Sequence, residues 1–474
     1  MKRVHHLLFL YIFGLLVHGA WALTITQVED WDPAYYRSTA LAIAQGRGAT
    51  SGAVWHLGNL PEQLPYLADL YWMPLPSRIL VPLMWLWPNG GDQLTTVLLA
   101  ASWGPLAYLI ARELAMDRGL AGLAGVFAGS GLLYARCIST PDSVALTGCL
   151  GGLTCLAMAR GRWRSAALCC FLIALCRNDG FVLAPFVALA FVGWRSLLVA
   201  LSGPAAFALW SLRNFAVGGW AFIESRRLAS QSMAVYDFVL NQQAETGFLD
   251  RAIYLATDGW FFAIFQWFVI FPLPATFVVL FWKPRWVRAL AAYWIFYPFV
   301  LQFLAPGLTS GGSLFRSGAL LFPFAVVIAI HSIATLGRFS ERKRGYHWAF
   351  LPLILAMCWW GVTVYVINYQ KAPVYDACDI AAVLPAEEVI FTTHPLLVEG
   401  RCGRQGVVLI KDMAAEQVDE LKQRFGIHYA VLELEGDKKA LSAEELEAVL
   451  PGWKPIAPRL YESPEKSSAT PSVP

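Results

Sequence analysis

The sequence carries little charge. Only 15% of its 474 residues are Asp, Glu, Lys or Arg, and 57% are hydrophobic, whereas a soluble domain typically carries about 25% charged residues. Because this deficit extends over most of the length, it predicts that lipid surrounds much of the chain. The net charge of +3 is too small to indicate nucleic acid as a partner. The 20 Trp residues agree with a lipid bilayer as the partner, since Trp favours the membrane–water interface.

The sequence also lacks the common nucleotide and hydrolase motifs. It has no P-loop, no Gly-x-Ser-x-Gly, no His-Glu-x-x-His and no Gly-x-Gly-x-x-Gly in a βαβ setting. ATP-driven transport and the common hydrolase chemistries are therefore disfavoured. The nine cysteines do not form the paired C-x-x-C motifs of a zinc site. Cys378 and Cys402 lie outside the apolar runs and are expected either to form a disulfide in an oxidising compartment or to remain free thiols.

Long apolar runs predict membrane-spanning helices of about 20 residues each. The first run, residues 6–26, is interpreted as an uncleaved span rather than as a signal peptide, because the rest of the chain is itself rich in spans. The pair near 165–177 and 180–193 is short for two crossings and could form a re-entrant break. About eleven spans are expected in all, the others lying near 93–115, 119–136, 143–160, 196–213, 259–281, 287–304, 317–336 and 347–368.

Clusters of Lys and Arg in the short loops set the orientation. With this count of spans, the clusters fall on the same side as Lys2 and Arg3, and the positive-inside rule makes that side cytoplasmic. The N-terminus is then cytoplasmic, as in a bacterial inner membrane protein. The long segment 27–92 and everything after residue 368 face the periplasm or the exterior. Long polar segments gather on this non-cytoplasmic face, so the functional site is expected there.

The composition changes after residue 368. Short apolar strands alternate with amphipathic helices over 369–460, which predicts a small soluble α/β domain, and the Ser- and Pro-rich tail 461–474 is expected to be disordered. The predicted fold class is therefore an all-α polytopic membrane domain, residues 1–368, followed by this C-terminal α/β domain. The membrane domain is interrupted by the long non-cytoplasmic first loop, 27–92.

Acidic residues cluster directly after the first span, at Glu29, Asp30 and Asp32. Carboxylates at a bilayer surface can bind a metal ion, act as a general base or orient a hydroxyl nucleophile. The alternative is that Asp32 only caps a helix that Pro33 begins. Asp142 lies in a tight turn on the same face, as another helix cap or as a further functional acid. Asp30 and Asp142 are the candidate ligands of a divalent cation, the single cofactor considered.

Four arginines stand at span ends on the non-cytoplasmic face, against the positive-inside trend: Arg136, Arg177, Arg213 and Arg316. An ionisable group at membrane depth is costly and indicates function, although snorkelling or pairing with an acid is the alternative. Arg316 is the strongest candidate, because it ends a Gly- and Ser-rich loop and its planar fork suits a phosphate at the interface. Residues 78–87 predict an interfacial helix.

Six segments, taken in order along the chain, resemble the motifs of a known family: Asp30–Tyr36 running on to Gly48, Asp69–Pro76, Thr140–Ser143, Cys176–Gly180, Leu212–Asn214 and Phe315–Pro323. Their order resembles the GT-C superfamily of membrane glycosyltransferases, and most closely its protein O-mannosyltransferase and lipid A aminoarabinose transferase branch. The resemblance covers residues 1 to about 340. The sequence departs from the family where Asp32-Pro33 stands in place of a frequent Asp-Glu, which leaves the catalytic acid open between Asp30 and Asp32.

The resemblance implies an inverting hexosyl- or pentosyltransferase that uses a polyprenyl-phosphate sugar on the non-cytoplasmic face. Asp32 or Asp30 would deprotonate or orient the acceptor hydroxyl, and Arg316, helped by Arg213, would hold the carrier phosphate. The acceptor stays open among protein, lipid and polysaccharide. Further substrate contacts are expected from Asp142, Arg177, Tyr36, His56 and Asp69.

Two other functions remain as alternatives. A multi-pass transporter or flippase would need polar groups near mid-membrane and, ideally, internal repeats, and the sequence shows neither. A non-catalytic scaffold with a partner-binding C-terminal tail would tolerate neutral residues in place of the first-loop acids.

Overall fold

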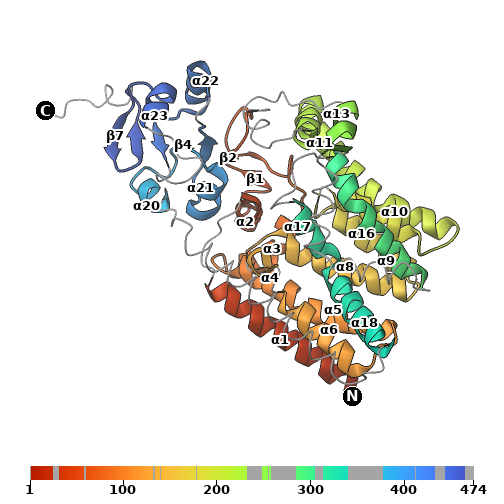
Figure 1. Cartoon of the computed structure of the whole chain (residues 1–474). Coiled ribbons are helices and arrows are strands. Elements are labelled where there is room, and N and C mark those ends of the chain that lie inside the picture. The colour runs from red at the N-terminus through yellow and green to blue at the C-terminus, as the bar shows by residue number, and fades with distance from the viewer. Residues whose placement is uncertain are drawn as a thin grey trace.

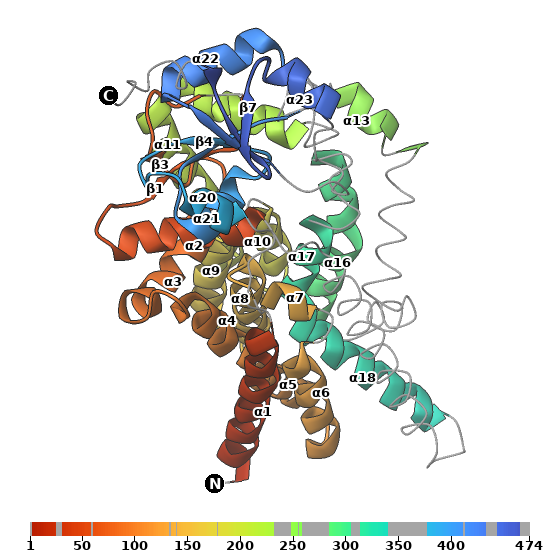
Figure 2. The ribbon, with the colours of Figure 1, turned by 90° about the vertical axis from the view of Figure 1, so that its left-hand side faces the viewer.

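The computed structural model describes residues 2–24, 31–57, 60–131, 134–138, 140–177, 179–231, 248–254, 256–257, 284–304, 313–339, 377–410, 413–432 and 443–464. Asp30 and the predicted spans near 259–281 and 347–368 lie outside these residues. Apolar helices form a bundle, and a smaller α/β unit lies at the end of the bundle opposite the N-terminus (Figures 1 and 2).

Three stretches of the described residues are long and apolar enough to cross a membrane: Val4–Leu23, Gly91–Glu113 and Trp194–Gly219. The predicted helical, membrane-embedded character is therefore confirmed, while the count of about eleven spans stays a prediction. The helices of the bundle are α1 (Lys2–Thr24), α4 (Gly91–Ala101), α5 (Trp103–Glu113), α6 (Arg118–Ser130), α7 (Ala135–Ile138), α8 (Ser143–Ala159), α9 (Trp163–Ala174), η2 (Gly180–Val182), α10 (Leu183–Ala188), α11 (Trp194–Gln231), α13 (Phe248–Tyr254), α16 (Arg285–Leu304), α17 (Ser313–Gly318), η4 (Ala319–Leu321) and α18 (Phe322–Phe339).

The first loop is folded toward the end of this bundle opposite the N-terminus (Figure 2), and its location on the non-cytoplasmic face stays a prediction. It holds helix α2 (Trp31–Ala44), the antiparallel pair β1 (Thr50–Ser51) and β3 (Tyr66–Leu67), strand β2 (Ala53–Val54) and helix α3 (Leu75–Leu86). Helix α3 covers residues 78–86 of the helix predicted over 78–87 and begins three residues earlier, while its location at a membrane interface stays a prediction. The side chains of Trp85 and Leu86 are 71% and 70% exposed, which suits a helix that rests on a bilayer.

The C-terminal α/β unit is built on a six-stranded sheet in the order β2-β5-β4-β6-β8-β7. Its first strand, β2, belongs to the first loop and pairs in parallel with β5. The unit is therefore not built from the C-terminal residues alone. Its own elements are α20 (Ala377–Ala382), β4 (Ile390–Thr392), α21 (Pro395–Cys402), β5 (Gly406–Val408), α22 (Ala415–Phe425), β6 (Tyr429–Val431), α23 (Ala443–Val449), β7 (Lys454–Ala457) and β8 (Leu460–Glu462).

One close approach inside the bundle sets the position of α17. A Cβ atom added at Gly151 in α8 would lie 1.6 Å from the backbone oxygen of Leu320 in η4. Only glycine permits backbones to pass this closely. The contact brings α17, which directly precedes η4, near the N-terminal end of α8.

Candidate active site

Three of the candidate residues meet at one guanidinium group. The Nη1 atom of Arg316 in α17 donates a hydrogen bond to Oδ2 of Asp32. The Nε atom of the same side chain lies 3.1 Å from Oδ2 of Asp142. The Asp142 side chain is 1% exposed and that of Arg316 is 12% exposed, whereas the Asp32 side chain is 30% exposed. Asp32 is therefore the acid of this cluster that a substrate can reach.

Asp32 lies in the first turn of α2 and is held from two sides. While Arg316 binds one carboxylate oxygen, the indole Nε1 of Trp72 donates to the other, at 2.9 Å. The Trp72 ring is itself stacked on Tyr35, with ring centroids 4.3 Å apart. The carboxylate thus has a set orientation. Sequence reasoning did not single out Trp72 as its partner, because an indole donor leaves no spacing pattern.

Asp142 stands at the N-cap position of α8 but makes no capping hydrogen bond with its side chain. Instead the carboxylate accepts from Ser143 Oγ at 3.0 Å and faces Arg316. The capping interpretation therefore does not account for this acid.

Arg177 belongs to a second, adjoining cluster around Asp179. Its Nε lies 3.0 Å from Asp179 Oδ1, and its Nη2 donates to Ser317 Oγ at 3.0 Å. The hydroxyl groups of Ser317 and of Tyr297 in α16 both donate to Asp179 Oδ2. Since Ser317 follows Arg316 directly, this cluster anchors the segment that carries Arg316.

The pKa of Asp179 reflects that cluster. Burial acts to raise this pKa, but the Arg177 charge and the hydrogen bonds from Ser317 and Tyr297 outweigh burial, so the pKa is lowered. The carboxylate is therefore ionised and keeps its three donors. Neither Ser317 nor Tyr297 was identified from the sequence, since neither residue type is distinctive in an apolar helix.

Tyr36 is buried beside the two acids of the site. Burial raises the pKa of Tyr36 well above its usual range, and the carboxylates of Asp32 and Asp142 raise it further. The phenol consequently stays protonated and is a hydrogen-bond donor at any physiological pH. The position of Tyr36 is compatible with the predicted contact between its phenol and the substrate, and that contact stays a prediction.

Asp69 and Arg213 lie apart from the Arg316 cluster. Arg213 Nη1 donates to the backbone oxygen of Ala68 at 3.1 Å, and Trp210 Nε1 donates to that of Asp69 at 2.9 Å. The Asp69 carboxylate forms an ion pair with Arg78. In this structure Arg213 connects the first loop to α11 through hydrogen bonds. From the sequence we had instead expected Arg213 to help Arg316 hold the carrier phosphate.

His56 lies in an aromatic cluster behind the site. Its ring is 4.5 Å from that of Trp55, and Trp55 is 4.8 Å from Trp72. Burial lowers the pKa of His56 to about 4, so the imidazole is neutral at physiological pH. The cluster separates His56 from the carboxylate of Asp32, with Trp72 between them.

The sequence also names Asp142, together with Asp30, as a candidate ligand of a divalent cation. Within the described part of the chain, no three His, Cys, Asp or Glu side chains gather closely enough to hold a metal ion. Asp32 and Asp142 both direct an oxygen at the Arg316 guanidinium. The metal site nominated at Asp30 and Asp142 stays a prediction, with Asp30 outside the described residues.

The fold that carries this site is shared with two solved structures, which agrees with the fold that the resemblance to the GT-C superfamily implies. The structure resembles that of ArnT from Cupriavidus metallidurans bound to undecaprenyl phosphate, with a TM-score of 0.56 and 14% sequence identity, covering 95% of this chain and 96% of that chain. It also resembles the archaeal oligosaccharyltransferase AglB from Archaeoglobus fulgidus in complex with an inhibitory peptide and a dolichol-phosphate. There the TM-score is 0.53 and the identity 12%, covering 91% of this chain and 70% of that chain.

Sequence comparison adds nothing to this likeness. No family model matches the sequence, and no curated protein matches it. At identities this low the two solved structures establish the fold alone, because one fold can host different functions.

Proposed function

We propose that this chain is a membrane glycosyltransferase that moves a sugar from a polyprenyl-phosphate carrier to an acceptor hydroxyl on the non-cytoplasmic face. The observation that carries the proposal is the Arg316 guanidinium between Asp32 and Asp142. It puts a cation that suits a phosphate in contact with a partly exposed carboxylate. Two proteins of the same fold were solved with undecaprenyl phosphate and with dolichol-phosphate, which supports a lipid phosphate as the partner here.

The reaction uses Asp32 as the general base. Its carboxylate takes the proton from the acceptor hydroxyl, whose oxygen attacks the anomeric carbon of the sugar as the bond from that carbon to the carrier phosphate breaks. The configuration inverts, and the carrier leaves as a lipid phosphate anion. Arg316 stabilises the negative charge that develops on the leaving oxygen, where a fixed cation contributes most.

Carrier binding changes the partners of Arg316. Its Nε and Nη1 atoms are engaged by Asp142 and Asp32, so a phosphate that binds this side chain replaces at least one carboxylate. When Arg316 turns to the phosphate, the Asp32 oxygen that Arg316 had engaged can accept a hydrogen bond from the acceptor hydroxyl. The donor therefore binds before Asp32 becomes an effective base.

The disulfide between Cys378 and Cys402 supports the proposed location of the C-terminal unit. Disulfides persist in the periplasm and in extracellular compartments and are rare in the cytosol. A bacterial inner membrane protein with a cytoplasmic N-terminus and a periplasmic α/β unit satisfies this chemistry and the charge distribution of the loops.

Transfer by the purified protein tests the proposal directly. A polyprenyl-phosphate sugar with a labelled sugar is supplied with a membrane extract as the source of acceptors, and the labelled product is identified by mass spectrometry. Wild-type protein should transfer label, and Asp32→Asn should lose about a hundredfold or more, as expected for a general base. Asp117→Asn, at the exposed N-cap of α6, is the matched control and should keep full activity.

The single variants Asp30→Asn and Asp32→Asn separate the two candidate acids. The contacts of Asp32 with Arg316 and Trp72 favour Asp32, so Asp30→Asn should retain most of the transfer. Wild-type rates in the double variant Asp30→Asn/Asp32→Asn would overturn the assignment of the base.

A further inference from the structure

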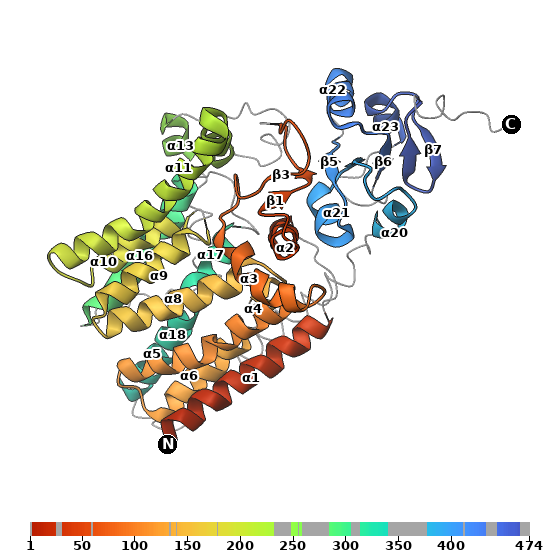
Figure 3. The same cartoon turned by 180° about the vertical axis from the view of Figure 1, so that it is seen from behind.

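The C-terminal unit and the first loop share one sheet and one core. Strand β2 of the first loop lies beside β5, with Ala53 opposite Gly406 and Val54 opposite Val407. Buried apolar side chains from both parts pack into a single cluster, among them Tyr35 and Leu396. The helix that carries Asp32 is therefore packed against the C-terminal unit as well as against the membrane bundle (Figure 3).

Helix α21 contacts α2 along one face. The residues of α2 that meet it are Trp31, Ala34, Arg37 and Ser38, which recur every three to four positions and so share a side of the helix. A Cβ atom added at Gly400 in α21 would lie 2.9 Å from the Cβ atom of Ala34. The two helices therefore touch at backbone distance.

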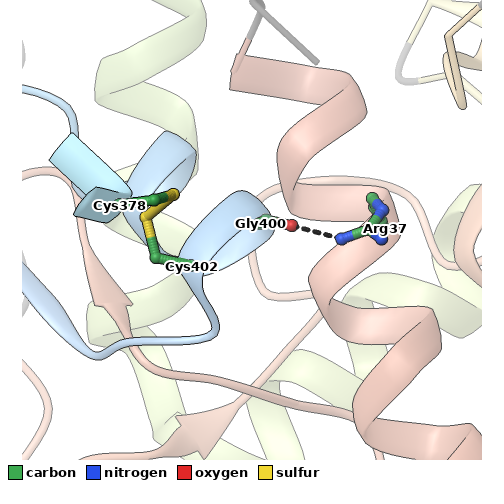
Figure 4. The surroundings of a disulfide bond; sticks show 4 residues. All are labelled: Arg37, Cys378, Gly400 and Cys402. Atoms are coloured by element: carbon green, nitrogen blue, oxygen red, sulfur yellow. Dashed lines mark hydrogen bonds between the residues drawn. A yellow bond between two sulfur atoms is a disulfide. The ribbon is translucent and has the colours of Figure 1, made fainter. Parts of the chain in front are cut away.

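Hydrogen bonds stabilise the contact between α2 and α21. Arg37 Nη1 donates to the backbone oxygen of Gly400 at 2.5 Å (Figure 4). Glu399 in α21 accepts from Ser38 Oγ at 3.2 Å and from Ser51 Oγ at 2.9 Å. One buried carboxylate of the C-terminal unit thereby joins α2 to the β1 region of the first loop.

The contact nearest to the active site joins Trp31 to His394. The indole Nε1 of Trp31 donates to Nδ1 of His394 at 3.0 Å. Trp31 is the first residue of α2 and directly precedes Asp32. Its ring meets the ring of Trp55 edge-on at 6.2 Å. The first turn of α2 is consequently held at two points, by His394 through Trp31 and by Trp72 through Asp32.

We infer that His394 is a positioning residue for Asp32, and that the C-terminal unit completes the active site through this hydrogen bond. The inference rests on the proposed function, in which Asp32 is the base. A base that is displaced by about 1 Å from its reacting hydroxyl loses a large part of its rate advantage. The bond to Trp31 sets where α2 begins and hence where the Asp32 carboxylate can be.

The chemistry of the bond defines informative variants. A neutral imidazole with its proton on Nε2 has one acceptor atom, Nδ1, and the indole of Trp31 needs that acceptor. In His394→Asn the amide oxygen can accept at a position close to that of Nδ1, whereas His394→Leu retains volume and loses the acceptor. Trp31→Phe removes the donor from the other side.

Kinetics of sugar transfer test the inference. His394→Leu and Trp31→Phe should each lower kcat at least tenfold with a KM for the carrier sugar within about twofold of wild type, because carrier binding depends on Arg316. His394→Asn should recover kcat to within about threefold. The double variant should be no slower than the slower single variant, since both changes remove one bond.

His428→Leu is the matched control. His428 precedes β6, whereas His394 follows β4, and these neighbouring strands are parallel, so the two histidines lie at opposite ends of the strands. This control should transfer at the wild-type rate. Equal losses in His394→Asn and His394→Leu, or wild-type kcat in His394→Leu, would overturn the inference.

Hydrogen exchange separates this inference from the proposed function. In folded His394→Leu protein, the amides of the first two turns of α2 should exchange faster than in wild type, while those of α8 should not change. If wild-type protein transfers no sugar, the proposed function is wrong, and the exchange result still decides whether His394 positions α2. Unchanged exchange in α2 would show that it does not.

Discussion

The Nε atom of Arg316 lies 3.1 Å from a carboxylate oxygen of Asp142, although Arg316 lies in the last turn of α17 and Asp142 stands at the start of α8. The Asp142 side chain is almost fully buried, and a buried charge without a partner is costly. Asp142 therefore competes with any phosphate for the Arg316 guanidinium.

The first prediction concerns that competition. Asp142→Asn should bind undecaprenyl phosphate roughly tenfold more tightly than wild type, which corresponds to about 1.4 kcal/mol, because one negative charge no longer opposes the phosphate. Displacement of a fluorescent lipid phosphate from protein in detergent measures the affinity. Glu113→Gln, which removes an exposed acid paired with Arg160 at the C-terminal end of α5, is the control. Weaker binding in Asp142→Asn would contradict the proposed phosphate site.

The second prediction concerns the fork of Arg316. Arg316→Gln should lower the transfer rate by about a hundredfold or more, the usual effect of removing one electrostatic stabiliser of a transition state. Arg316→Lys should recover only part of the rate, because a lysine ammonium cannot bridge two acceptors as a planar guanidinium does. The rates are measured with saturating carrier sugar. Equal activity of the Lys variant and wild type would show that charge alone suffices.

The third prediction concerns the glycine that brings η4 against α8. Gly151→Ala should lower the thermal midpoint and reduce transfer, because its Cβ atom would fall 1.6 Å from the Leu320 backbone oxygen and the backbone must move. Such overpacking typically costs about 1–3 kcal/mol.

Gly122 in α6 provides the matched control for that variant. A Cβ atom there would meet nothing within 4 Å, so Gly122→Ala should keep or slightly raise the midpoint, since alanine favours helix. If both variants behaved alike, the close approach at Gly151 would not be a determinant of the site.

The fourth prediction concerns pH. Burial lowers the pKa of His56 to about 4 in the folded protein, compared with about 6.5 in an unfolded chain. Between these values the unfolded chain binds more protons, so stability is full above pH 6.5 and is lost as the pH falls toward 4. The thermal midpoint in detergent should therefore drop over this window less in His56→Gln than in wild type. His5→Gln, at an exposed position of α1, should follow the wild-type curve.

Much of the architecture is readable from local sequence. Apolar runs predicted α1, α8 and α16 close to their observed bounds, and the composition change after residue 368 predicted the strands that form β4, β5 and β6. The single helix expected near 93–115 is divided by the structure into α4 and α5, with Ser102 between them. These elements follow from hydropathy and short-range pattern, which depend on neighbours in the chain.

The site was predictable in part. Asp32 was predicted from the acidic cluster after the first span, and Asp142 from its turn on the same face. Arg316 was predicted because an ionisable group at a span end is costly. The structure brings these three residues together. It directs Arg213 to the backbone of the first loop instead. No pattern in the sequence distinguishes an arginine that faces two carboxylates from one that faces a carbonyl oxygen.

The sequence by itself determined that the chain is a multi-pass membrane protein with its acids and arginines gathered at one face. Helices that cross lipid need long apolar runs, and the distribution of Lys and Arg in the short loops predicts which face each loop occupies. Only the tertiary structure decided that Arg316 meets Asp32 and Asp142 and that Trp31 meets His394. Those pairings depend on the approach of α8 to η4 at Gly151 and of α21 to α2 at Gly400. Contacts between distant segments arise from packing of the whole chain, and short-range sequence patterns do not specify them.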